Sequence, residues 1–191
     1  MEHTNLPTSS EVERELKREQ YKRRYRRTLK STVFALITAA AVAVLVATLW
    51  LPVLQIFGGS MTPTLEDGEI VVSVKTRTMK QGDVVAFYYN NKILIKRVIA
   101  NPGDWVNITE DGTVYVNDRL IEEPYITEKS YGDADIDFPY QVPDGKFFVM
   151  GDHRATSADS RHTVVGCVTQ EQVVGKIVFR IWPLEQLGQI H

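Results

Sequence analysis

The stretch Gly58-Gly59-Ser60-Met61-Thr62-Pro63-Thr64-Leu65 divides this chain of 191 residues into two unlike parts. It closes a segment, residues 31–65, that contains no Asp, Glu, Lys or Arg, and a region rich in strand-forming residues follows it. Small and proline-restricted neighbours hold Ser60 by backbone geometry and not by a bulky side chain. We therefore predict that Ser60 is a nucleophile, which the rest of the chain positions and activates.

Upstream of this stretch, the sequence predicts a single transmembrane helix over residues 31–57. From Val33 to Leu51 the chain is apolar except for Thr38 and Thr48. About 20 apolar residues suffice to cross the hydrocarbon core of a bilayer. The run is too long for the apolar region of a cleaved signal peptide, so we expect a lipid bilayer as a permanent partner.

Residues 1–30 form a basic tail, with nine Lys or Arg against five Asp or Glu. Basic residues beside a span stay in the cytoplasm, which places residues 58–191 on the extracytoplasmic side. This orientation explains the basic cluster without nucleic acid, and no nucleic-acid partner is expected. Residues 1–21 are polar and are expected to be unstructured.

Beyond residue 65, β-branched and aromatic runs bounded by turn residues predict strands. The fold class is therefore mainly β: a single helix followed by a β-rich catalytic domain of antiparallel sheets, with a small inserted β subdomain at about residues 104–145. Residues 122–145 are expected to form a long excursion. The predicted strands are Ile70–Val74, Val84–Tyr89, Lys92–Ile99, Trp105–Thr109, Thr113–Val116, Lys146–Met150, Thr163–Val168 and Val173–Ile181.

A serine needs a base to take its proton, and the sequence offers two kinds. Lys96 lies on a predicted strand with mostly apolar residues on both faces, where burial would lower its pKa. A lysine at the sheet edge with its amine in water is the alternative. His153 could instead form a Ser/His/Asp set with Asp152 or Asp159, although a solvated loop histidine fits its spacing better.

Two other kinds of site are not expected. The acidic loop at Asp133, Asp135 and Asp137 lacks the glycine and the final glutamate of a calcium loop. The loop from Asp152 to His162 has no recognised metal-ligand spacing, so no metal and no cofactor are predicted. Cys167 is the only cysteine, which excludes an intramolecular disulfide and favours a small buried side chain.

Three motifs, in this order, resemble those of bacterial type I signal peptidases, also called leader peptidases. They are Ser60-Met61-Thr62-Pro63-Thr64-Leu65, Lys96-Arg97-Val98-Ile99 followed by Pro102-Gly103-Asp104, and Gly151-Asp152-His153-Arg154 with Ser157-Ala158-Asp159-Ser160-Arg161. The C-terminal segments Gly166-Cys167-Val168, Val174-Gly175-Lys176 and Trp182-Pro183 are similar too. The likeness covers roughly residues 31–191.

The resemblance implies a Ser/Lys dyad, with Ser60 as the nucleophile and Lys96 as the general base. It implies that Ser157 orients the lysine by a hydrogen bond and that Met61 packs beside the substrate pocket. Four further residues would support the same loop, namely Asp159, Arg161, Asp152 and Arg154.

Two positions depart from the family pattern. Gly58 stands where some members supply a hydroxyl to the oxyanion hole, so Gly58, Gly59 and Ser60 can offer only backbone donors there. His153 replaces an asparagine that many members carry, and its role is left open.

The implied function is removal of signal peptides from exported preproteins after a small-x-small site, by a monomer in the bacterial plasma membrane. A specialised processing peptidase, for example one for pilins, would share every motif. An inactive membrane-tethered β-domain that acts as an assembly partner is a further alternative. A self-cleaving repressor of the LexA-like class shares the dyad, but it would carry a DNA-binding domain in place of the span.

Overall fold

The computed structural model describes residues 9–190 and divides into two compact units, Met1–Ala47 and Thr48–His191. The first unit is helical, and the second contains every strand of the described chain. Because the second unit carries the three motifs, the site has to be built from its sheets.

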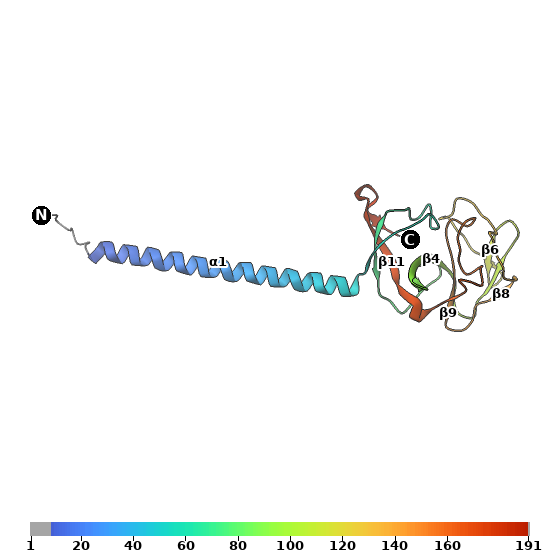
Figure 1. Ribbon diagram of the computed structural model, residues 1–191, viewed down its shortest axis with the longest axis horizontal. Coiled ribbons are helices and arrows are strands. Elements are labelled where there is room, and N and C mark those ends of the chain that lie inside the picture. The colour runs from blue at the N-terminus through green and yellow to red at the C-terminus, as the bar shows by residue number, and fades with distance from the viewer. Residues whose placement is uncertain (1–8, 191) are drawn as a thin grey trace. The chain divides into compact units, whose positions relative to one another are not determined.

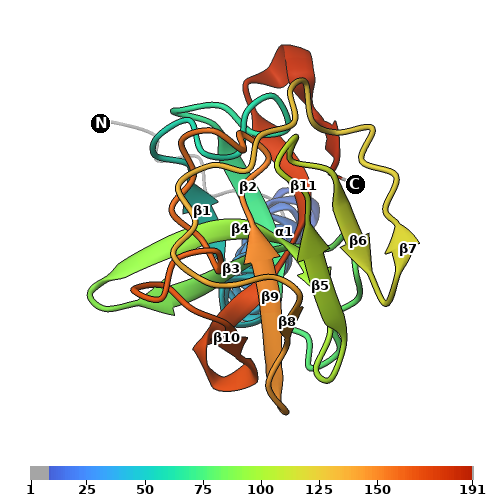
Figure 2. The same ribbon diagram turned by 90° about the vertical axis from the view of Figure 1, so that its right-hand side faces the viewer.

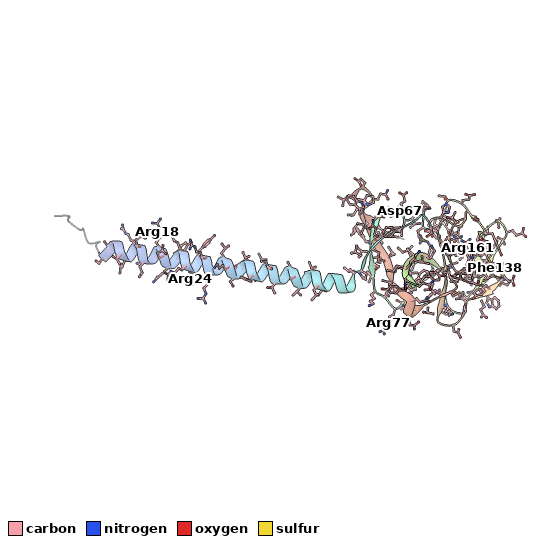
Figure 3. The ribbon with its side chains drawn as sticks, viewed as in Figure 1. Arg18, Arg24, Asp67, Arg77, Phe138 and Arg161 are labelled. Carbon is pink, nitrogen blue, oxygen red and sulfur yellow. The ribbon has the colours of Figure 1, made fainter. Side chains whose placement is uncertain are left out.

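Helix α1 runs from Ser9 to Trp50 as one continuous element of 42 residues (Figure 1). Its segment Val12–Val46 is long and apolar enough, by length and composition, to cross a membrane. The charged side chains in the N-terminal, basic half of α1 are exposed, and Arg18 and Arg24 project away from the helix (Figure 3). Ion pairs three residues apart, such as Lys22 with Glu19 at 3.1 Å, favour helix in this half.

Two predictions for this region are wrong. The tail was expected to be unstructured over residues 1–21, but residues 9–21 are helical, while residues 1–8 lie outside the described part. The helix was expected to reach residue 57, but it ends at Trp50, because Pro52 cannot continue it and the chain turns into a strand.

The large sheet has the strand order β1-β2-β11-β3-β4-β9-β10, with β12 paired to β11, and all of its pairs are antiparallel (Figure 2). Two 3₁₀ turns, η1 (Gln170–Gln172) and η2 (Leu184–Gln186), flank β11. The strands are β1 (Val53–Gln55), β2 (Ile70–Val74), β3 (Val84–Tyr89), β4 (Lys92–Ala100), β9 (Lys146–Met150), β10 (Val168–Thr169), β11 (Val173–Trp182) and β12 (Gly188–Gln189).

A smaller antiparallel sheet, in the order β7-β6-β5-β8, lies within the inserted segment. Its strands are β5 (Trp105–Ile108), β6 (Val114–Val116), β7 (Arg119–Leu120) and β8 (Tyr140–Gln141). The predicted β-rich fold of antiparallel sheets with one apolar N-terminal helix is thus confirmed.

One predicted strand, Thr163–Val168, is mostly a turn. The Val165 and Gly166 amides both donate to the carbonyl of His162, at 3.1 and 2.8 Å, and Gly166 has a φ of 63°. That left-handed backbone favours glycine and ends any extended run. Only β10, from Val168, keeps strand geometry.

The large sheet is buried on both faces. In β3, Val84 and Ala86 belong to the apolar cluster that also contains Met61 and Leu65, whereas Val85 and Phe87 belong to a second cluster. A third cluster packs the small sheet against Phe148, Met150 and the end of β4. Because Met61 and Leu65 are buried in the first cluster, the core of the sheet anchors the turn that carries Ser60.

Candidate active site

The turn that carries Ser60 is fixed at both ends. Gly58, with a φ of 83°, begins it and donates its amide to Asp67 Oδ1 at 2.6 Å. The Leu65 amide donates to the Met61 carbonyl at 2.9 Å, which closes one helical turn. This local order leaves the Ser60 hydroxyl projecting beside the sheet.

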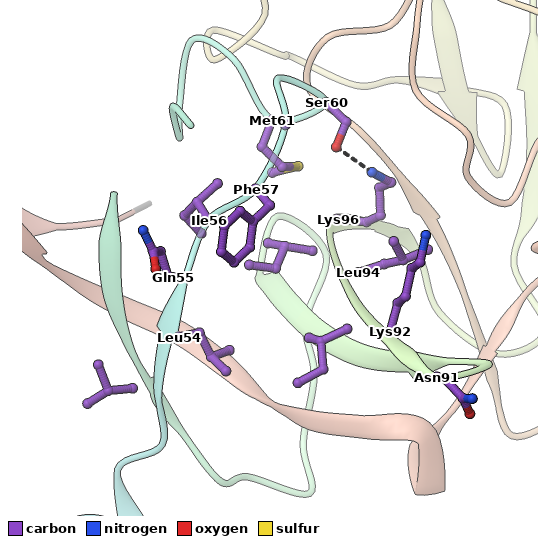
Figure 4. Close-up of a pocket in the computed structure, with 14 residues that line it drawn as sticks. Leu54, Gln55, Ile56, Phe57, Ser60, Met61, Asn91, Lys92, Leu94 and Lys96 are labelled. Carbon is purple, nitrogen blue, oxygen red and sulfur yellow. Dashed lines mark hydrogen bonds between the residues drawn. The ribbon is translucent and has the colours of Figure 1, made fainter. Parts of the chain in front are cut away.

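Lys96 reaches that hydroxyl from β4. Lys96 lies opposite Val85 of β3 in the sheet, and only 2% of it is exposed. Its Nζ donates to Ser60 Oγ at 2.6 Å (Figure 4). Burial lowers the pKa of Lys96 to about 8, against the opposing attraction of the Asp159 and Asp152 carboxylates. Of the two alternatives for Lys96, the structure shows the buried one, and the neighbouring Arg97 is buried as well. A neutral amine at this distance can accept the serine proton.

His153 does not occupy the corresponding position. Its side chain is exposed and its Nδ1 lies 2.8 Å from Thr156 Oγ1, while only its backbone amide contacts the nucleophile's residue, donating to the Ser60 carbonyl at 3.1 Å. The imidazole therefore faces Thr156, and the geometry favours lysine over histidine as the base.

Ser157 is buried, but the expected hydrogen bond to Lys96 is absent from the described structure, where Ser157 Oγ has no hydrogen-bond partner. Its hydroxyl instead lies close to Gly151: a Cβ at that glycine would lie 2.2 Å from Ser157 Oγ and 2.5 Å from the Ser60 carbonyl oxygen. Gly151 thus allows the loop to approach the nucleophile's backbone.

We expect Gly151→Ala to disrupt this contact. Its Cβ has to displace the Ser60 carbonyl, and overpacking of this kind typically costs about 1–3 kcal/mol of folding free energy. Turnover should fall by about tenfold or more, because small shifts of a nucleophile are costly. Gly188→Ala is the matched control, since its Cβ would meet nothing nearer than Gln186 O at 4.0 Å. Equal thermal stability and turnover of both variants would contradict this account.

Arg97, next to Lys96 in the chain, joins three segments in the interior. It is 1% exposed, and its Nε and Nη2 donate to Asp152 Oδ1 and Oδ2 at 3.0 and 2.7 Å. Its Nη1 donates to the Gly82 carbonyl at 2.8 Å, and its guanidinium lies 3.8 Å from the centroid of the Tyr125 ring. Thr64 also donates to Asp152, at 2.5 Å, so this cluster holds the far end of the nucleophile's turn.

Arg154 and Arg161 attach the loop 151–161 to the excursion before β8. Arg154 Nη1 donates to Glu123 Oε2 at 3.0 Å, and this pair is almost completely buried. Arg161 pairs with Asp159 at 2.9 Å and donates to the carbonyls of Ser130 and Tyr131 at 3.3 and 2.9 Å.

Each of the four predicted supporting residues of this loop thus takes part in a buried ion pair: Asp152 with Arg97, Arg154 with Glu123, and Asp159 with Arg161. Sequence reasoning missed four contributors: Thr64, Arg97, Glu123 and Tyr125. The sequence could have pointed to Arg97, because it is the second charged residue on a predicted strand with two apolar faces. Nothing in the sequence pointed to Glu123 or Tyr125, since both lie in a segment without helical or strand periodicity.

An apolar groove, which we call the first groove, opens at the dyad and has a volume of about 670 Å³ (Figure 4). It is lined by residues 53–58, Ser60, Met61 and residues 91–96. The 92–96 stretch of β4 pairs with β3 on one side, and β9 pairs with β4 only from Arg97 onward. The other edge of this stretch carries no strand within residues 9–190.

The backbone donors at the nucleophile are few. The Gly58 amide is already bound to Asp67, whereas the Ser60 amide has no acceptor within the described chain. No group of three or more His, Cys, Asp or Glu side chains that could hold a metal ion occurs within residues 9–190.

Comparison with known proteins agrees with this architecture. The sequence model of the family "Signal peptidase, peptidase S26" matches residues 29–182. Signal peptidase IB of Staphylococcus aureus (strain COL) is 40% identical over 152 residues, covering 69% of this chain and 78% of the relative. Signal peptidase I of Streptococcus pneumoniae serotype 4 (strain ATCC BAA-334 / TIGR4) is 30% identical over 174 residues, covering 71% and 84%. This chain belongs to the peptidase S26 signal peptidase family.

A crystal structure of a signal peptidase I from Enterococcus faecalis V583, at 2.27 Å resolution, is also similar to this chain. The match has 30% sequence identity and a TM-score of 0.44, and it covers 52% of this chain and 96% of the other.

Proposed function

We propose that this protein is a membrane-bound serine endopeptidase that removes signal peptides from exported preproteins, with Ser60 as nucleophile and Lys96 as general base. The observation that carries the proposal is the contact of 2.6 Å between Lys96 Nζ and Ser60 Oγ, made by an amine that is almost completely buried. Membership of the S26 family and the names of its relatives supply the substrate class.

In the first step, neutral Lys96 takes the Ser60 proton while Oγ attacks the scissile carbonyl. The Ser60 amide, which has no acceptor within the described chain, would donate to the developing oxyanion. When the carbon–nitrogen bond breaks, Lys96 returns the proton to the leaving amine, and an acyl-enzyme remains. Lys96 then deprotonates a water, which attacks the ester and releases the signal peptide together with free Ser60.

The acyl half of the substrate, which ends at the scissile bond, would lie in the first groove. The free edge of residues 92–96 in β4 and the short strand β1 both line this groove, so an extended peptide can add to a strand edge there. Ile56, Met61 and Ile95 supply apolar lining. The preference for small side chains at the cleavage site follows from the family resemblance and not from this lining.

Helix α1 would anchor the enzyme in the bacterial plasma membrane, with the basic tail in the cytoplasm and the domain from residue 58 outside. The apolar length of α1 supports the membrane anchor, and the run of Lys and Arg before residue 31 supports the orientation. The cleavage site of a signal peptide lies just beyond its own apolar segment. Ser60 follows the end of α1 by ten residues in the chain, a short connection that suits such a substrate.

The pH dependence of cleavage tests the base. Since the pKa of Lys96 is about 8 and only its neutral form accepts a proton, kcat/KM should rise with pH through a midpoint near 8. We expect His153→Ala to keep this midpoint. The measurement is a pH–rate profile for preprotein cleavage in detergent. A profile that is flat between pH 6 and 10, or one whose rise disappears in His153→Ala, would exclude Lys96 as the base.

A further inference from the structure

A second groove, of about 430 Å³, meets the first at the dyad and is not used by the acyl half of the substrate. It shares Ser60, Lys92, Leu94 and Lys96 with the first groove, but no residue of β1 lines it. Five further residues line the second groove and not the first: Tyr89, Ala158, His162, Val164 and Val165. It therefore runs from the dyad toward the loop 158–165.

The loop 158–165 forms the outer wall of the second groove, and two residues outside this loop hold it in place. Asp135 accepts the Thr163 amide at 2.6 Å and the Thr163 hydroxyl at 2.7 Å. The Tyr89 hydroxyl donates to the carbonyl of Val164 at 3.1 Å, which ties the loop to the end of β3. The wall is thus a built feature of the fold, made from segments on both sides of the groove.

This fixed wall presents an apolar side chain to solvent. Val164 is 72% exposed, beside the partly buried Val165 and the small side chain of Ala158. Apolar surface gains free energy when a ligand covers it. The chemistry of the groove therefore fits an apolar segment of peptide better than a charged one.

We propose that the second groove binds the first residues of the mature protein, which follow the scissile bond, and that it favours apolar side chains there. This proposal rests on the proposed function. Lys96 has to reach the leaving nitrogen to return its proton, so the chain that begins at this nitrogen starts beside Lys96. With the acyl half in the first groove, the second groove is the continuous apolar path that leads away from the dyad.

The mature half leaves when the acyl-enzyme forms, so contacts in the second groove act on acylation and not on hydrolysis of the acyl-enzyme. Covering one valine side chain changes a rate or binding constant by about tenfold. The identity of the first mature residues should therefore change kcat/KM by about five- to tenfold.

The test uses the full chain in detergent. The substrates are peptides that share the same signal-peptide half and differ only in their mature residues. The first three mature residues are all Val, all Ser, all Asp or all Lys, and a methyl ester of the same acyl half has a leaving group too small to fill the second groove. Wild type should cleave the Val peptide about five- to tenfold faster than the Ser and Asp peptides. Val164→Asp should lose this preference and favour the Lys peptide, with hydrolysis of the methyl ester unchanged. The matched control is Leu120→Ser, an equally apolar, 57% exposed position that lines neither groove.

Equal kcat/KM of wild type for all four peptides would overturn the proposal, and this comparison needs no variant to fold. It would also be overturned if Val164→Asp lowered hydrolysis of the methyl ester as much as cleavage of the Val peptide. Failure of the proposed function is distinct from both, because wild type would then cleave neither the peptides nor the methyl ester.

Discussion

Lys96→Met should lower kcat/KM for preprotein cleavage by about three orders of magnitude or more, and Ser60→Ala should do the same, as removal of one member of a catalytic pair usually does. Methionine keeps the length and most of the volume of lysine, but it cannot accept the serine proton. Without that transfer, a neutral serine hydroxyl at pH 8 is a poor nucleophile.

The folded state should tolerate Lys96→Met. The lysine amine is buried, and its burial is what lowers its pKa, so the charged amine contributes no net stability there. We expect the Tm of Lys96→Met to equal or exceed that of wild type. A loss of activity with an unchanged Tm separates a catalytic role from a structural one.

Lys75→Met is the matched control, because Lys75 is exposed and lines neither groove. It should retain wild-type turnover. The assay is cleavage of a purified preprotein in detergent, with initial rates at pH 8. Near-wild-type turnover in either Ser60→Ala or Lys96→Met would rule out the dyad.

The burial of a charge on β4 was predictable from sequence because it depends on local alternation. Both faces of residues 92–99 are mostly apolar, so one of the two charges at Lys96 and Arg97 was expected to face the core, whereas both are buried. The partners of these charges were not predictable. Thr64 and Asp152 are 88 positions apart, and Arg154 and Glu123 are 31 apart, so only the folded topology brings each pair together.

Two of the three errors of local structure have opposite causes. The tail was expected to be unstructured because it is polar, but Glu, Lys and Arg are good helix formers and their ion pairs add to that tendency. Thr163, Val164 and Val165 were expected to form a strand because they are β-branched. Here the bonds of Asp135 to Thr163 and the backbone of Gly166 override that propensity.

Asp159→Asn should destabilise the domain by about 3–5 kcal/mol, the usual cost of leaving one partner of a buried ion pair uncompensated. Asp159 Oδ1 accepts from Arg161 Nε at 2.9 Å, and Oδ2 accepts from the Gly151 amide at 3.0 Å. Both Asp159 and Arg161 are almost completely buried, so water cannot replace the lost charge. Asp137→Asn, at an exposed position, should stay within about 0.5 kcal/mol of wild type. The measurement is urea unfolding followed by tryptophan fluorescence.

The same substitution should move the pH profile of whatever folded enzyme remains. The Asp159 carboxylate raises the pKa of Lys96, because a negative charge nearby stabilises the ammonium form, while the Arg161 guanidinium lowers it. Removing the carboxylate leaves the burial and the guanidinium, so the pKa of Lys96 falls and the rise of kcat/KM should begin at a lower pH than in wild type. A purely structural role of Asp159 would lower the amplitude of the profile without moving its midpoint. A midpoint that stays near 8, or that shifts upward, would therefore show that this carboxylate does not act on the charge of Lys96.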